Sequence, residues 1–125
     1  MHRRSLNIRF KDKVLDGIKT TTIRDTCWPI GVPIMLFHWA DKPYRSKQVE
    51  IAPVIVTAAT SIDISLGDFT DWVSFSEIMG LDRPLWQCEG FNGPLDMNDW
   101  FLPMLKPNQT ITKFLHRFQL YTDFT

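Results

Sequence analysis

The residues Gly17-Ile18-Lys19-Thr20-Thr21-Thr22-Ile23-Arg24-Asp25 carry the strongest local signals in this 125-residue chain. Gly17 follows a short stretch with helical character, and glycine most readily takes the left-handed conformation that ends a helix. The β-branched residues after it favour a strand over Thr20–Asp25. The segment therefore predicts a helix that ends at Gly17 and a strand that begins shortly after it.

Side chains alternate between the two faces of a strand. This places Thr20, Thr22 and Arg24 on one polar face, while Ile23 points the other way as a natural core residue. Lys19 stands next to the glycine turn, where strict alternation need not hold, and it can direct its amine toward the same polar face. We therefore interpret this face as the wall of a pocket.

Outward from this segment, apolar periodicity predicts the remaining elements. Strands are predicted at Leu6–Phe10, Ile34–Ala40, Val49–Ile64 and Lys113–Phe124, helices at Lys11–Asp16, Asp71–Met79 and Leu95–Leu105, and irregular chain at Asp82–Pro94. The long stretch Val49–Ile64 is expected to bend near Pro53 and Ala58. Pro103 is expected to shorten or kink the last helix.

This order of elements predicts an α+β fold. Several strands with few helical crossovers favour a mostly antiparallel sheet with two or three short helices. Such a sheet often closes into a small barrel to hide its edges, and residues near the barrel mouth can then surround a small ligand. At 125 residues the chain has the usual size of one domain, so we expect a single domain over residues 1–125.

Charge and composition narrow the class of function. The net charge is zero, which argues against broad, charge-driven binding to nucleic acid. Residues 1–24 nevertheless hold seven Lys/Arg and two Asp, so this segment carries +5 and the remainder −5. With two cysteines one disulfide is arithmetically possible, but nothing suggests a secreted framework. No signal peptide, apolar run long enough to span a membrane, or metal-ligand spacing is visible, so we expect a cytoplasmic protein without cofactor or metal.

The polar face contains the parts of a nucleophilic site. A hydroxyl such as that of Thr22 becomes a good nucleophile when a neighbouring base takes its proton. Lys19 can be that base if burial or nearby positive charge lowers its pKa. Arg24 can supply this charge, or bind a carbonyl, carboxylate or phosphate. The alternative interpretation is a Thr-rich edge strand with solvated cations.

A second segment of interest is Cys88-Glu89-Gly90-Phe91. A partly buried Glu89 is suited to donate a proton, because burial disfavours the charged carboxylate; the alternative is an exposed acid in a loop. Trp28 and Trp86 are candidates for stacking on a flat ligand. Arg9 and Thr20 are further candidates for binding substrate.

Leu6–Asp25, with the pattern Phe … Gly-x-Lys-Thr-x-Thr-Ile-Arg, resembles the ASCH domain of the PUA-like β-barrel superfamily. The later Glu-Gly-Phe at 89–91, followed by a predicted helix with Trp100 and Phe101, is a second similarity. The resemblance implies a PUA-like barrel. Some small bacterial members remove the acetyl group from N4-acetylcytidine with a lysine as proton acceptor, a threonine as nucleophile and a glutamate as proton donor.

Transferred residue by residue, the resemblance implies that Lys19, Thr22 and Glu89 are catalytic. The function expected is that of an amidohydrolase acting on an N-acylated nucleoside-like small molecule. The alternative is a non-catalytic module that binds single-stranded RNA or a nucleotide. A ribonuclease on the same scaffold ranks lowest, because no histidine pair is apparent for acid–base chemistry.

Overall fold

The computed structural model describes residues 1–66 and 71–122, a mixed α+β structure built on one six-stranded sheet. Its strands are β1 (His2–Ser5), β2 (Thr21–Arg24), β3 (Pro33–Trp39), β4 (Gln48–Leu66), β5 (Val73–Phe75) and β6 (Thr110–Leu120). Its helices are α1 (Lys11–Leu15), α2 (Leu85–Cys88) and α3 (Pro94–Phe101), with 3-10 turns η1 (Ile8–Phe10) and η2 (Leu102–Met104). None of the helices within these residues is long and apolar enough to cross a membrane.

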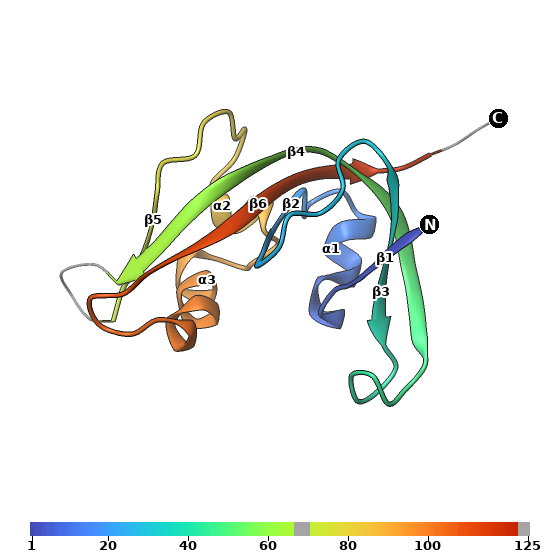
Figure 1. Ribbon diagram of the computed structural model, residues 1–125, viewed down its shortest axis with the longest axis horizontal. Coiled ribbons are helices and arrows are strands. Elements are labelled where there is room, and N and C mark those ends of the chain that lie inside the picture. Colours follow the sequence, from blue (N-terminus) through green and yellow to red (C-terminus); the bar gives the residue numbers. More distant parts are fainter. Residues whose placement is uncertain (67–70, 123–125) are drawn as a thin grey trace.

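The sheet has the strand order β1-β3-β4-β6-β2, and β5 pairs with the far end of β4. All pairs are antiparallel except β1 with β3, so the predicted mostly antiparallel sheet is confirmed. The long strands β4 and β6 run side by side and arch over the molecule, and the three α-helices lie beneath this arch (Figure 1). The predicted bend in β4 is seen as a register irregularity against β6 between Val56 and Ala58.

The predicted barrel is wrong, because the sheet remains open. Strands β1 and β2 form the two ends of the strand order and do not pair with each other. Residues that follow β1 and residues of β2 instead line a common cavity, with Asn7 on one side and Thr22 on the other.

Three local predictions are also corrected. The strand expected at Leu6–Phe10 is a 3-10 turn, because the Asn7 side chain accepts a hydrogen bond from the backbone N–H of Arg9 and leaves Ile8 exposed. The helix expected at Asp71–Met79 is replaced by β5, whose Val73 is buried and pairs with β4. The stretch predicted to be irregular holds α2.

Other predictions hold. Gly17 has a φ of 73° just after α1, the left-handed conformation expected of a helix end. The last α-helix ends at Phe101, and Pro103 lies in the following 3-10 turn. The closing strand is β6, although residues 123–124 of the predicted range lie outside the described part of the chain. Below the sheet the core includes Phe10, Trp28 and Phe118.

Candidate active site

A cavity of about 220 Å³ lies between the N-terminal segment, β2 and the chain that connects α2 to α3. Its walls are formed by Ser5, Leu6, Asn7, Phe10, Lys19, Thr22, Arg24, Glu89, Phe91 and Trp100. The structure therefore brings together the three residues predicted to be catalytic, although Glu89 is separated from the other two by more than sixty residues of sequence. Pockets for drug-sized ligands usually measure roughly 300–1,000 Å³, so this one suits a ligand group no larger than one ring with a short substituent.

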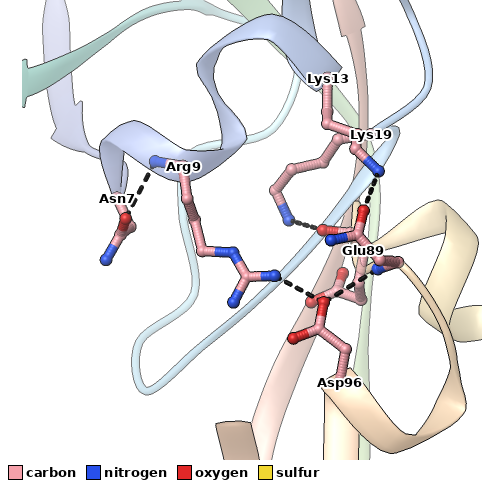
Figure 2. Close-up of polar contacts among 7 residues, drawn as sticks. Asn7, Arg9, Lys13, Lys19, Glu89 and Asp96 are labelled. Atoms are coloured by element: carbon pink, nitrogen blue, oxygen red, sulfur yellow. Dashed lines mark hydrogen bonds and ion pairs between the residues drawn. The ribbon is translucent and has the colours of Figure 1, made fainter.

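Lys19 enters the cavity from the turn between α1 and β2. The backbone N–H groups of Ile18 and Lys19 both donate to the carbonyl oxygen of Lys13, at 2.9 Å each, which fixes the turn. The Lys19 side chain is buried, and its Nζ donates to the backbone carbonyl of Glu89 at 2.6 Å (Figure 2). Its ammonium group also lies 4.7 Å from the centre of the Phe10 ring.

Burial lowers the pKa of Lys19 to about 8. Loss of hydration is the largest cause, since it disfavours the charged amine. Glu89 opposes this effect by raising the Lys19 pKa, and the positive charges of Arg24 and Arg9 lower it further. A substantial fraction of Lys19 is therefore neutral near physiological pH, which is the form that can accept a proton.

Thr22 and Arg24 follow on the same face of β2, as alternation predicts. Arg24 Nε donates to Thr22 Oγ1 at 2.9 Å. This bond uses a lone pair of the hydroxyl oxygen and leaves the hydroxyl proton free to be transferred. The Arg24 guanidinium lies over the ring of Trp28, 4.7 Å from its centre, and this contact helps to hold the cation in place.

Glu89 lies at the end of α2 and is buried. Its carboxylate Oε2 accepts a hydrogen bond from the hydroxyl of Thr21, and its carbonyl oxygen accepts the bond from Lys19. The backbone N–H of Thr20 also donates to the carbonyl of Cys88 at 2.8 Å, which joins the end of α2 to the start of β2. These bonds hold the Glu89 segment against the Lys19 turn.

Gly90 allows this close approach. Its φ is 92°, and a Cβ there would stand 3.1 Å from Phe10 Cδ1 and 3.2 Å from Cβ and Cδ of Lys19. We expect Gly90→Ala to lower the free energy of unfolding by about 2–4 kcal/mol, because backbone strain and steric contact add. Chemical denaturation measures this loss.

Gly31→Ala is the matched control for this substitution. Gly31 also has a positive φ, 78°, but a Cβ there meets nothing within 4 Å. Gly31→Ala should therefore lower the free energy of unfolding only by the cost of the strained backbone conformation, about 1–2 kcal/mol. Equal losses in the two variants would show that the contact with Phe10 and Lys19 has no steric cost.

Aromatic side chains form the apolar part of the cavity wall. Phe10 packs edge-on against Phe91 and Trp100, with ring centres 5.3 and 5.5 Å apart. The Arg9 guanidinium lies within 5.5 Å of all three ring centres and donates to the Asp96 carboxylate at 2.6 Å (Figure 2). This arrangement offers a flat ligand several ring faces and edges.

Four residues predicted to bind substrate lie outside the cavity wall. Arg9 contacts the aromatic wall, and Trp28 is buried behind Arg24. Trp86 packs against the core, and Thr20 lines two neighbouring hollows and accepts a hydrogen bond from Arg83.

Sequence reasoning missed other parts of the site. The polar residues Ser5 and Asn7 line the cavity, yet they were predicted only as the start of a strand or not at all. Trp100 packs against the core and also lines the cavity, a role that the sequence did not indicate. Among the described residues, no group of three or more His, Cys, Asp or Glu side chains is placed to hold a metal ion, and Cys27 and Cys88 are free thiols.

His116, to which the sequence assigned no role, contacts residues of the site from β6. It is fully buried on β6 and stacks on Trp28 with a ring separation of 5.2 Å. The backbone N–H of Trp28 donates to His116 Nε2 at 2.8 Å, so Nε2 is an acceptor and Nδ1 carries the proton. Nδ1 then donates to the carbonyl of Thr22 at 3.3 Å.

Burial lowers the pKa of His116 below its ordinary value of 6.5, with Arg24 adding to the effect. The unfolded chain therefore binds a proton at a higher pH than the folded one. Stability from this group is complete above about pH 6.5 and is lost as pH falls below it. We expect His116→Gln to be destabilised at pH 7.5 and to show a flatter decline from pH 7 to 5 than the wild type.

Urea denaturation at several pH values measures this difference. His2→Gln is the control, because His2 is exposed on β1. It should keep both the stability and the pH slope of the wild type. A slope that is unchanged in the His116 variant would contradict the assignment.

Comparison with family models, with curated protein sequences and with solved structures finds no match to this chain. The interpretation of the site therefore depends on its own geometry and on the motif described above.

Proposed function

We propose that the protein is an amidohydrolase that removes an acyl group from an N-acylated nucleoside such as N4-acetylcytidine. The observation that carries this proposal is the shared cavity, which is lined by a buried lysine with a pKa of about 8, by Thr22 and by Glu89. The motif around Gly17–Arg24 supports the same reaction, because it resembles that of the ASCH amidohydrolases. A PUA-like ancestry for this open sheet is part of the proposal.

In the first half of the reaction, neutral Lys19 takes the proton of Thr22 as Oγ1 attacks the acyl carbonyl carbon. The hydrogen bond from Arg24 to this oxygen favours the alkoxide character that develops. The protonated Lys19 then passes this proton to the Glu89 carboxylate, which gives it to the departing amine as the C–N bond breaks. The products are a free nucleoside and an acyl ester on Thr22.

In the second half, water attacks the ester carbonyl. A base in the cavity, either Glu89 or Lys19, takes a proton from this water, and the C–O bond to Thr22 breaks with return of a proton to its oxygen. One amide and one water thus give one amine and one carboxylic acid, and the side chains return to their starting state. The aromatic wall holds the flat base during both halves.

The test is a panel of N4-acylcytidines that carry acetyl, butyryl or benzoyl groups. We expect release of cytidine and the acid, with the acetyl compound preferred because the cavity of about 220 Å³ leaves little room for a longer group. The alternative, an RNA-binding module, predicts no turnover and an affinity for single-stranded RNA that falls steeply with salt. Failure to hydrolyse any member of the panel would overturn the proposal.

A further inference from the structure

Thr21 touches Glu89 from the side remote from the cavity. Because side chains alternate along β2, Thr21 faces away from Thr22 and Arg24, and it lines a neighbouring hollow instead of the cavity. Its hydroxyl donates to the carboxylate Oε2 of Glu89, and both side chains are buried. Thr21 therefore contacts a predicted catalytic group from a place that a substrate in the cavity does not reach.

A hydroxyl suits this position for a chemical reason. It can donate to an ionised carboxylate and accept from a protonated carboxylic acid, so it can bond to the group in both states without moving. Glu89 must pass through both states if it donates a proton in each catalytic cycle. A valine of the same shape at residue 21 offers neither bond.

Three other titratable groups interact electrostatically with the Glu89 carboxylate. Lys19, Arg24 and His116 are the titratable groups that interact with Glu89 across the cavity and from β6. Lys19 and Arg24 line the cavity with it. Without the directional bond to Thr21, the carboxylate is free to turn toward Lys19 or Arg24, and such an ion pair favours the ionised form over the protonated form that donates the proton.

We propose that Thr21 is a positioning residue that fixes the Glu89 carboxyl in the cavity wall for proton donation. The catalytic part of this inference rests on the proposed amidohydrolase function. The contact itself can be tested without any turnover. Two adjacent threonines on opposite faces of one strand thus take different roles in this proposal: Thr22 reacts, and Thr21 orients.

The first measurement is spectroscopic. The chain contains three glutamates, Glu50, Glu77 and Glu89, so protein labelled with 13C-glutamate gives three side-chain carboxyl signals, and Glu89→Gln identifies one of them. We expect Thr21→Val to move the Glu89 signal and Thr21→Ser to restore it. Thr20→Val is the control, because the Thr20 hydroxyl bonds to Arg83 and not to Glu89.

The second measurement is kinetic. Thr21→Val should lower kcat for N4-acetylcytidine by up to about 10²-fold with little change in KM, since misplacement of a catalytic group by about 1 Å has an effect of that size. The rising limb of its pH profile should also move to higher pH, because a carboxylate turned toward Lys19 raises the Lys19 pKa. In the Glu89→Gln background the same substitution should have almost no effect.

These outcomes separate the inference from the proposed function. If the wild type hydrolyses no amide, the function fails, and the Glu89 signal still decides whether Thr21 holds the carboxyl. If that signal responds equally to Thr21→Val and Thr20→Val, or if the kinetic effects of Thr21→Val and Glu89→Gln simply add, the positioning role is overturned. Thr21→Ala replaces the valine variant in each comparison if the latter does not fold.

Discussion

Thr22→Val is expected to abolish turnover of N4-acetylcytidine, with a loss of at least about 10³-fold in kcat, because valine keeps the shape of threonine and removes the oxygen that attacks the amide carbonyl carbon. Thr22→Ser should retain measurable activity, since it keeps the hydroxyl. Thr20→Val should resemble the wild type, because Thr20 lies outside the cavity wall. Steady-state release of cytidine measures all three.

Thr22→Val also removes the acceptor of the Arg24 hydrogen bond, and an unpaired, partly buried donor costs about 1–3 kcal/mol. Circular dichroism and thermal unfolding must therefore accompany the kinetics. A second measurement avoids the variant altogether: acid quench of the wild type during turnover, followed by peptide mass spectrometry, should place an acyl group on Thr22. An acyl group on another residue, or a folded Thr22→Val protein with normal turnover, would contradict the role of Thr22.

The part of the site that could be predicted from the sequence is the part encoded by neighbouring residues. Gly17 indicates the turn, because few residues other than glycine adopt the left-handed backbone conformation that ends a helix. Alternation along a strand then places Thr22 and Arg24 on one face, and the structure agrees. Thr20 was assigned to that face wrongly, because β2 begins at Thr21 and the rule of alternation does not extend to the residue before the strand.

Contacts between segments that are far apart in the sequence could not be predicted from local sequence patterns. The hydrogen bond between Thr21 and Glu89 joins residues 68 positions apart, and no local pattern encodes it. The same holds for Asn7 and Trp100, which line one cavity although they are far apart in the sequence. Trp28 carries the same aromatic signal as Trp100 but is buried under Arg24, so residue type alone does not separate a wall aromatic from a core one.

The fold shows the same difference between features encoded by neighbouring residues and features that depend on distant ones. Short-range signals located most strands and the end of α3, while the barrel was inferred from the general tendency of sheets to hide their edges. In this chain the sheet stays open instead, with β1 and β2 at the two ends of the strand order. The motif that fixed the candidate site was therefore more informative than the strand count that suggested closure.

Lys19→Met should lower kcat/KM for N4-acetylcytidine by about 10²–10⁴-fold, the usual contribution of a general base. In the wild type, kcat/KM should rise with pH and level off above about 8, because the neutral amine is the active form and the pKa of Lys19 is about 8. This rising limb should be absent from the methionine variant. Lys19→Arg should not restore activity, since a guanidinium keeps its proton in this range.

Lys13→Met is the matched control for this comparison. Lys13 comes from α1 and also donates to a residue of the α2–α3 connection, Asn92 Oδ1 at 2.9 Å (Figure 2). It does not line the cavity. Its variant should keep the activity and the pH limb of the wild type. Because methionine fills the buried site of Lys19 without a charge to desolvate, the Lys19→Met protein should fold, so a loss of rate reflects the missing base. A rising limb near pH 8 that persists in folded Lys19→Met would mean that another group accepts the proton of Thr22, and the amine of Lys19 would then serve only to bind the Glu89 carbonyl.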